Sequence, residues 1–340
     1  MFKLLIKTIL LFVLLTAAGI YFVTYTLYKK NFNTNNEKTY IYIHTGSGYN
    51  ELLKQLENKN LLINKTTFSI SANIMGLKNN IKAGRYLIDK ETTNKTLINN
   101  LKNGKQALVK LALDNIRTKA QLAKTLSENL EIDYNKALNA LSDDNIAKNY
   151  NFTNDQFMCM FIADTYYLNW NTSIKRFLDI MYQQNKKIWN TERLNKAASI
   201  NKTPTEVYIL ASIVHLESPR DKELPTIAGL YINRLKKNMR LASDPTVIFA
   251  HNDFTIKRVR FKHLNIKSPY NTYKHRGLPP GPISTAPVKV IDAVLNYDRH
   301  NYLYMSAKDD LSGYHNFSSN FDGHKKNAKS IRKQFNKLKL

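Results

Sequence analysis

Glu217 has the sequence setting of a general acid. Three apolar residues precede it by seven, four and three positions, so on a helix they share its face: Leu210, Ile213 and Val214. That face should turn toward a core, and Pro219 disfavours helix at Ser218, so we expect Glu217 in the last turn, near the negative end of the helix dipole. Apolar burial and the dipole both disfavour a carboxylate and should raise its pKa. A carboxylic acid that keeps its proton near neutral pH is what acid catalysis of glycosidic cleavage requires.

The start of this helix is marked by local signals. Thr203 is the expected N-cap, Pro204 fits the first helical position, and Glu206 completes a capping box three residues after the cap. A second interpretation of Glu217 is an ordinary glutamate at a helix end that reaches solvent or pairs with Arg220. For such a stretch taken alone, that second interpretation is the more common one.

The N-terminus predicts a membrane-spanning helix. Residues 8–28 contain no charge, and at about 1.5 Å per residue they extend about 30 Å, one hydrocarbon thickness. The small residues at 16–19 allow a cleaved signal peptide as the alternative. We favour an uncleaved single span because no small-x-small site precedes the polar region, and because Tyr21, Tyr25 and Tyr28 suit a membrane interface. Residues 1–7 would then be a cytoplasmic tail, and nearly all function would lie after Lys30.

The composition narrows the class of protein. A chain of 340 residues is long enough for two domains, and its net charge of +25 is spread along the sequence rather than gathered in one basic arm. That charge suits anionic lipid or an anionic cell-wall polymer, although a lysine-rich proteome would give the same value. With no stacking or recognition motif, we expect no nucleic-acid partner.

The cysteine and histidine content bears on disulfides and metals. The single Cys159 excludes an internal disulfide and should be a buried thiol. His315 and His324 lack metal-ligand spacing, so we expect no metal.

Hydrophobic periodicity divides the rest of the chain into three parts. A polar linker at 29–38 should lead to a small α/β module at 39–106, with a strand at either end (39–44 and 84–88) and helices at 49–59, around 70–77 and at 93–101. A strand at 109–113 and mainly helical sequence should fill 107–200, ending in one charged helix at 185–201. The last part, 201–340, should contain helices from Thr203, Pro225, Ser243 and Pro287, a hairpin of 302–307 and 314–318 around a turn at 309–313, and a basic helix at 322–338.

Five motifs follow one another in this last part: Ala211-Ser212-Ile213-Val214-x-x-Glu217, Asn233-Arg234-Leu235, Ser243-Asp244-Pro245-Thr246-Val247-Ile248, Ser268-Pro269-Tyr270-Asn271-Thr272-Tyr273 and Gly277-Leu278-Pro279-Pro280-Gly281-Pro282-Ile283. Together they resemble the YceG-like (MltG) family of endolytic murein transglycosylases, most strongly from Thr203 to Phe317. The resemblance implies that 39–106 is a LysM-like module. We therefore expect an α+β protein: an N-terminal transmembrane helix, a LysM-like α/β module, a mainly helical intermediate region and a mixed α+β catalytic domain.

The resemblance also implies an activity and its surroundings. The protein would be a lyase anchored in the bacterial cytoplasmic membrane, with its catalytic domain on the outer side. It would cleave the bonds between N-acetylmuramic acid and N-acetylglucosamine within peptidoglycan strands, leave 1,6-anhydro ends and terminate nascent glycans, with Glu217 as acid and base. Its partners would be glycan strands, the membrane and a peptidoglycan synthase, and no cofactor is implied.

Two positions depart from the family pattern. The family usually has a glutamate where this chain has His215, and a Glu-Gly pair where this chain has Asp114-Asn115. Because His215 lies two residues from Glu217, a helix turns it away from the acid, and we interpret it as structural. Helix geometry therefore matches Glu217, rather than position 215, to the essential acid.

Further site residues follow from the same motifs. Asp244 is either a helix cap or a second carboxylate that stabilises charge. Asn233 and Arg234 lie on a helix, where the guanidinium would pair with an acid or hold a peptide or lactyl carboxylate. The remaining candidates for a glycan groove or for loop packing are Ser243, Thr246, Tyr270, Asn271 and Tyr273. If Asp244 activated water, the protein would be a muramidase, and if catalysis had been lost it would be a cell-wall-binding scaffold.

Overall fold

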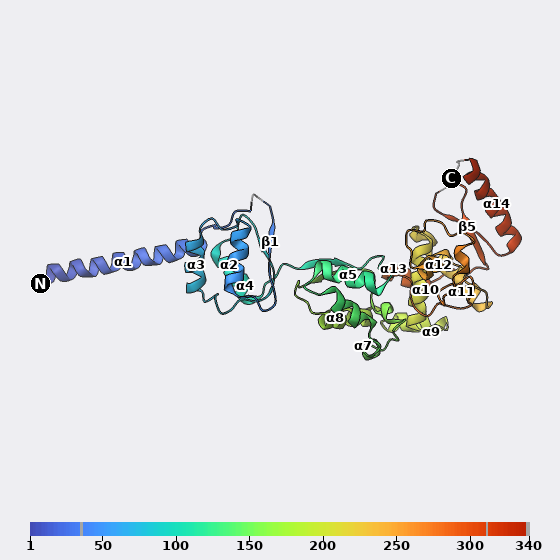
Figure 1. Cartoon of the computed structure of the whole chain (residues 1–340), viewed down its shortest axis with the longest axis horizontal. Helices are drawn as coiled ribbons and strands as arrows, with labels where there is room; N and C mark the ends of the chain where they lie inside the picture. Colours follow the sequence, from blue (N-terminus) through green and yellow to red (C-terminus); the bar gives the residue numbers. More distant parts are fainter. Residues whose placement is uncertain (35–36, 311, 338–340) are drawn as a thin grey trace. The chain divides into compact units, whose positions relative to one another are not determined.

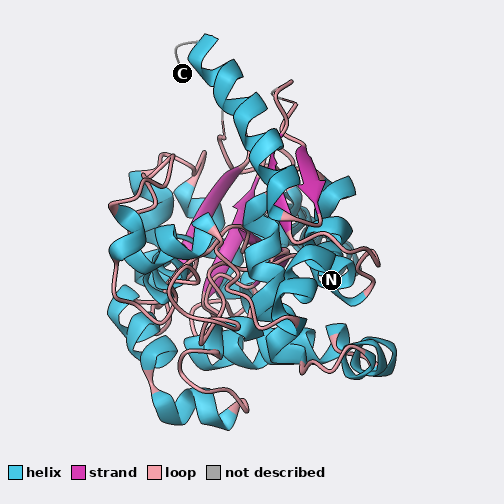
Figure 2. Ribbon diagram, turned by 90° about the vertical axis from the view of Figure 1, so that its right-hand side faces the viewer, coloured by secondary structure: helices cyan, strands magenta, loops and turns pink. Residues whose placement is uncertain are grey.

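The computed structural model describes residues 1–34, 37–310 and 312–337, and the chain divides into two compact units. The first unit contains 1–110, 129–132 and 167–173, and the second contains the rest. Most of the described chain is helical, and the strands are short and antiparallel (Figure 2). The predicted mixture of helices and small sheets is thus confirmed in its coarse form.

The first unit combines one long apolar helix with a small two-stranded module (Figure 1). Strands β1 and β2 pair antiparallel with Thr39 opposite Ile88 and Ile43 opposite Gly84. Alternate residues of both strands and one face of each helix enclose an apolar core, as the predicted periodicities require. The elements are α1 (Phe2–Tyr28), β1 (Thr39–Ile43), α2 (Tyr49–Asn58), α3 (Lys65–Ile74), β2 (Gly84–Ile88) and α4 (Asn94–Asn103).

The end of α1 is part of the first unit's packing. Thr26 is buried, and its carbonyl accepts hydrogen bonds from Asn94 Nδ2 at 2.8 Å and Ser71 Oγ at 3.1 Å. The segment predicted as a linker at 29–38 contains buried residues, Asn31 and Phe32, while positions 35 and 36 lie outside the described residues. Of the described helices, α1 has the length and apolar character to cross a membrane, which fits either an anchor or a signal sequence.

The second unit is built mainly of helices. Strands β5 and β6 form the predicted antiparallel hairpin, and residue 311 of its turn lies outside the described chain. Strand β3 pairs with β4 across the sequence predicted to be mainly helical. The elements from β3 onward are β3 (Val109–Ala112), α5 (Lys119–Asn129), α6 (Tyr134–Ser142), α7 (Asp144–Asn149), β4 (Thr165–Leu168), α8 (Ile174–Ile188), α9 (Thr191–Ser199), α10 (Pro204–Glu217), α11 (Leu224–Lys236), α12 (Asp244–His251), α13 (Val288–Leu295), β5 (Tyr304–Ala307), β6 (His315–Ser318) and α14 (Phe321–Lys337), with short 3₁₀ turns at Phe157–Met160, Asp221–Glu223 and His263–Asn265.

One helix prediction in this region was wrong. The single charged helix expected over 185–201 is broken between α8 and α9. Asn190 caps the second helix, because its side chain accepts a hydrogen bond from the backbone N–H of Arg193. A capping asparagine inside a helical pattern therefore stopped one helix and began another.

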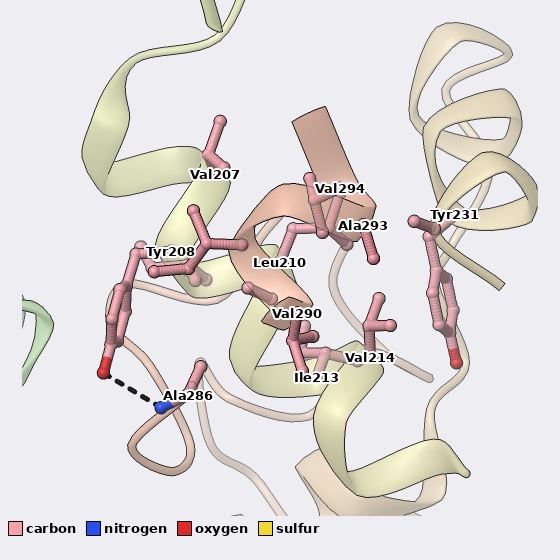
Figure 3. Packing of buried hydrophobic residues seen from close by; sticks show 14 of the residues in the cluster. Val207, Tyr208, Leu210, Ile213, Val214, Tyr231, Ala286, Val290, Ala293 and Val294 are labelled. Carbon is pink, nitrogen blue, oxygen red and sulfur yellow. Dashed lines mark hydrogen bonds between the residues drawn. The ribbon is translucent and has the colours of Figure 1, made fainter. Parts of the chain in front are cut away.

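Helix α10 forms the centre of the second unit's core. Every residue from Val207 to Val214 is buried, so the helix is enclosed on all sides and not only on the face that carries Glu217. Figure 3 shows its side chains packed against Val290, Ala293 and Val294 of α13, with Tyr231 of α11 beside them. Helix α10 is consequently a rigid support for the residue at its end.

The Gly277–Ile283 loop is fixed against α10. The backbone N–H of Ile283 donates to Ser212 Oγ at 3.1 Å, and the N–H of Ala286 donates to Tyr208 Oη at 3.0 Å. Gly281 allows a close approach, because a Cβ there would lie 2.0 Å from the carbonyl oxygen of Asp155. The loop therefore holds one side of α10 in place without regular secondary structure.

Candidate active site

Glu217 is the last residue of α10, and the hydrogen-bond donors around it gather at one of its two carboxyl oxygens. Thr203 caps the helix, and the capping box with Glu206 is present, as predicted. The Glu217 side chain is half-buried, and its Oε1 accepts hydrogen bonds from Tyr231 Oη and from Ser243 Oγ, both at 2.5 Å. Among the described residues, no hydrogen-bond donor contacts Oε2. One oxygen is thus held by the protein, and the other is left for a ligand.

Arg220 does not pair with Glu217. Its guanidinium donates to the carbonyl oxygen of Ser312, with distances of 3.1 Å from Nε and 2.5 Å from Nη2, and lies over the ring of Tyr314. The alternative in which Arg220 neutralises the glutamate is therefore wrong. Because no basic side chain in the described part of the chain bonds to it, the carboxyl group is free to hold a proton.

The pKa of Glu217 is raised above its ordinary value. Burial is the largest cause, because it removes water from the charged form. The hydrogen bonds from Ser243 and Tyr231 act in the opposite direction, since they stabilise the carboxylate. The negative charge of Asp244 raises the pKa further, and His315 lowers it. The predicted direction and the predicted role of burial are confirmed, while the contribution of the helix dipole stays a prediction.

The two donors to Glu217 are held in place by different means. Tyr231 lies on α11 and is almost completely buried, and burial raises the pKa of its hydroxyl well above the usual value. Ser243 precedes α12, and its backbone N–H donates to Thr272 Oγ1 at 3.0 Å while its carbonyl accepts from Thr246 Oγ1 at 2.7 Å. Because the backbone is clamped in this way, the Ser243 hydroxyl is directed to Glu217 and does not cap its own helix.

Asp244 is exposed beside this site. Its Oδ1 accepts a hydrogen bond from Tyr273 Oη at 2.6 Å, and no backbone N–H contacts its side chain among the described residues. The capping arrangement considered for Asp244 is therefore wrong. Asp244 and Tyr273 also line an open hollow of about 710 Å³. Of the predicted groove residues, these two are the ones placed at an opening.

The amide and guanidinium groups predicted to bind substrate are used within the protein. Asn233 Nδ2 donates to the carbonyl oxygens of His300 at 2.7 Å and Tyr302 at 3.1 Å. Arg234 donates to the carbonyls of Leu303 and Leu241. These contacts join α11 to the loop before β5.

The loop predicted to line a glycan groove is also engaged internally. Asn271 is fully buried and donates to the carbonyl oxygens of Leu264 and Ile266, both at 2.9 Å. The ring of Tyr270 packs against Phe249 with a centroid distance of 4.7 Å. Asn271 and Tyr270 thus shape the loop from inside, while Tyr273 faces outward to Asp244.

A second carboxylate, Glu223, has a very different environment that the sequence did not indicate. Its Oε1 accepts the backbone N–H of His315 at 2.7 Å, and its Oε2 lies 2.9 Å from His315 Nδ1 and 3.2 Å from Ser218 Oγ. A carboxylate only accepts hydrogen bonds, so Nδ1 carries the proton. The pair joins the segment after α10 to strand β6. A spacing of 92 residues between the partners gives no local signal.

The two departures from the family pattern lie next to each other. His215 Nε2 is 4.0 Å from Asp114 Oδ1, and the ring is mostly buried. Burial lowers the pKa of His215, which favours its neutral form. A carboxylate at both positions would place two negative charges together, so a histidine opposite an aspartate relieves repulsion.

Metal-binding geometry is absent from the part of the chain that the structure describes. No group of three or more His, Cys, Asp or Glu side chains there could hold an ion. Cys159 is buried, as expected, and burial raises the pKa of its thiol well above the usual value.

Comparisons with known proteins identify the relatives of this chain. The model of the YceG-like family matches residues 41–330. An endolytic murein transglycosylase of Bacillus subtilis (strain 168) is 38% identical over 144 residues, which is 41% of this chain and 38% of that protein. An endolytic murein transglycosylase of Streptococcus pneumoniae (strain ATCC BAA-255 / R6) is 25% identical over an alignment that covers 96% of this chain and 65% of that protein.

A solved structure is similar as well. The crystal structure of a putative YceG-like protein from Listeria monocytogenes superimposes with a TM-score of 0.60 at 26% identity, covering 85% of this chain and 98% of that one. The chain spans less than two thirds of the length of the curated relatives that it matches.

Proposed function

We propose that this chain, which belongs to the YceG-like family, is a membrane-anchored lytic transglycosylase that cleaves within peptidoglycan glycan strands. The observation that carries the proposal is Glu217: a half-buried carboxyl group with a raised pKa, held through one oxygen by two neutral hydroxyls. Such a group can give up a proton and take one back near neutral pH. The relatives in Bacillus subtilis and Streptococcus pneumoniae are endolytic murein transglycosylases, which supports the same activity.

The proposed reaction needs a single acid and base. Glu217 donates a proton to the glycosidic oxygen as its bond to the muramyl anomeric carbon breaks, which leaves an oxocarbenium-like sugar. The resulting carboxylate then accepts the proton of the muramyl C6 hydroxyl while that oxygen bonds to the anomeric carbon. The products are a 1,6-anhydro end and a free hydroxyl on the leaving sugar, and no water is consumed.

The hydrogen bonds at Glu217 suit both halves of this cycle. Tyr231 and Ser243 donate to Oε1 in either protonation state, so they hold the group still while the proton moves at Oε2. They also stabilise the carboxylate that forms after the first step, which keeps the pKa from rising so far that the acid could not release its proton.

Asp244 and Tyr273 are the residues that we propose to face the substrate. Asp244 is exposed, and its charge acts on Glu217, so it is placed to stabilise positive charge on the sugar. The same position supports a second candidate function, a muramidase in which Asp244 activates water. We assign Asn233, Arg234 and Asn271 to supporting the loops around the site, since backbone carbonyls already bind their donors. Thr246 orients Ser243, and Tyr270 packs the loop from inside.

The first unit suits a role in substrate capture at the membrane. Its module has the order strand, helix, helix, strand, with the two strands paired, which supports the LysM-like assignment. We propose that α1 anchors the protein in the cytoplasmic membrane and that both units act on the outer side. There the enzyme would terminate nascent strands beside a peptidoglycan synthase.

The proposal is tested by the products of the full-length protein in detergent. Parent protein and the Glu217→Gln variant are incubated with uncrosslinked glycan strands, and the ends are identified by mass spectrometry. We expect anhydro-muramyl ends from the parent and none from the variant. Reducing ends would instead establish the muramidase and make Asp244→Asn the next variant. Glycan binding without any product would leave a cell-wall-binding scaffold.

A further inference from the structure

Apart from Asp244 and Tyr273, the residues that line the hollow beside Asp244 have no role in the reaction described above. It is lined by Asp244, by Tyr273 and by five residues of the segment after α12: Arg258, Val259, Arg260, Phe261 and Leu264. A volume of about 710 Å³ is within the size of ordinary ligand sites. The hollow is close to Glu217, because its lining residue Asp244 directly follows Ser243, and the Ser243 hydroxyl donates a hydrogen bond to Glu217.

The loop that forms the hollow is strongly basic. Between residues 253 and 276 there is one acidic residue, Asp253, against seven basic ones: Lys257, Arg258, Arg260, Lys262, Lys267, Lys274 and Arg276. The sequence after Asp322 is also rich in lysine and arginine, but the stretch from 253 to 276 is the one that contributes residues to the hollow. Guanidinium groups present paired donors that match the two oxygens of a carboxylate.

Phe261 gives the hollow an apolar surface. Its side chain is 91% exposed, although an aromatic ring of this size is normally covered. It lies between Arg260 and Lys262 in the sequence, so a ligand that covers the ring would also meet positive charge. This combination suits a ligand with both apolar groups and carboxylates.

We propose that the hollow binds the peptide attached to the muramyl sugar, through the carboxylates of that peptide. The inference rests on the proposed function, because it takes the sugar beside Glu217 to be N-acetylmuramic acid. That sugar carries its peptide as a substituent, and the hollow begins one residue from the serine that contacts the acid. Asp244 repels anions, so the peptide carboxylates should lie nearer to Arg260 than to Asp244.

The consequence is a preference for strands that still carry their peptides. A charge-assisted contact of one arginine with a carboxylate is worth roughly tenfold in affinity. The preference should weaken as salt is raised, because the arginine is exposed and its field is screened.

The test measures binding in place of cleavage. Full-length Glu217→Gln protein in detergent is titrated by calorimetry with two glycans of equal length, one with intact peptides and one from which the peptides have been removed enzymatically. We expect about tenfold tighter binding of the peptide-bearing glycan. Adding Arg260→Gln should abolish this preference, and adding Arg276→Gln should leave it, because Arg276 belongs to the same basic loop but does not line the hollow.

The outcomes separate the two proposals. Equal affinities for the two glycans, or a preference that survives Arg260→Gln in a protein with unchanged thermal unfolding, would overturn the peptide subsite even if the parent enzyme cleaves glycan. If the parent protein forms no product while Arg260→Gln still abolishes the preference for peptide-bearing glycan, that result would support the subsite and overturn the catalytic proposal. Binding of neither glycan would overturn the peptide subsite, and the products of the parent enzyme would still decide the catalytic proposal.

Discussion

Glu217 and Glu223 lie six residues apart and show two ways of placing a carboxylate inside one unit. Glu217 has two neutral hydroxyl donors, both on Oε1, and retains some contact with solvent. Glu223 is buried and accepts hydrogen bonds on both oxygens, from the backbone and ring of His315 and from Ser218. A carboxyl group that exchanges protons needs an oxygen left accessible, whereas one that joins segments has both oxygens occupied. We therefore interpret Glu217 as catalytic and Glu223 as structural.

The largest expected effect is on catalysis at Glu217. The Glu217→Gln variant should lose product formation by at least about 10³-fold, because glutamine can still accept hydrogen bonds but cannot transfer a proton. Its circular dichroism and thermal unfolding should match those of the parent. Substantial residual cleavage would move the acid to another residue and remove the distinction between the two glutamates.

The second effect is on stability at Glu223. Glu223→Gln should lower the free energy of unfolding by about 3 kcal/mol, since the amide NH2 replaces one of the two accepting oxygens and leaves one buried N–H of His315 facing another donor. Denaturant unfolding followed by fluorescence measures it. The matched control is Glu192→Gln, whose exposed pair with Lys196 on α9 is screened by solvent and should contribute far less to stability. Equal losses in the two variants would contradict the structural role.

The third effect is a shift in pH dependence. The Tyr231 hydrogen bond lowers the pKa of Glu217, so Tyr231→Phe should raise that pKa further. Activity that requires the protonated acid would then persist to higher pH. We also expect kcat/KM to fall by roughly tenfold, because the free energy of one hydrogen bond to a charged group corresponds to about that factor. Steady-state rates across pH measure both changes.

The control for this shift is another buried tyrosine hydroxyl. Tyr208 on α10 donates to the carbonyl of Phe161 and accepts from the backbone N–H of Ala286, and the second of these bonds is drawn in Figure 3. Neither bond involves Glu217. Tyr208→Phe should destabilise the protein by about 1–3 kcal/mol, because it leaves a buried N–H unpaired, but it should not move the pH profile. A pH profile moved equally by both variants would show that the Tyr231 contact is not specific.

The smallest effect is the dependence of stability on pH. Because the pKa of Glu217 is raised in the folded protein, its contribution to stability is fully present below the unfolded value and is lost as pH rises through the folded one. Relative to the parent, Glu217→Gln should therefore become more stable as pH increases from about 4 to about 8. The change is small because the side chain is not sealed from solvent. Parallel unfolding curves at both pH values would contradict the raised pKa.

Local features were predictable from the sequence, because their signals lie within a few residues. Thr203, Pro204 and Glu206 mark the start of α10, and Pro219 marks its end. The spacing of apolar residues before Glu217 correctly placed its face against a core. The same reasoning found β1 and β2, α11 and α13 and the hairpin of β5 and β6.

Contacts between distant segments were not predictable from a single chain. Tyr231 and Ser243 reach Glu217 from 14 and 26 residues away, and periodicity gives the direction of a side chain but not its partner. Asn233 and Asn271 were chosen for their polar chemistry, yet irregular loops contain backbone carbonyls that need donors, and these amides satisfy them. Strand β4 was missed because its partner, β3, lies more than fifty residues earlier.

The most direct test of the account is the titration of Glu217 itself. Full-length protein labelled with ¹³C at the glutamate carboxyl groups is titrated by NMR, and the Glu217→Gln variant identifies the signal of interest. The account predicts that the signal missing from the variant titrates above 4.5, the ordinary glutamate value. A signal that titrates at or below that value would show a permanently ionised carboxylate and contradict the assignment of Glu217 as the catalytic acid.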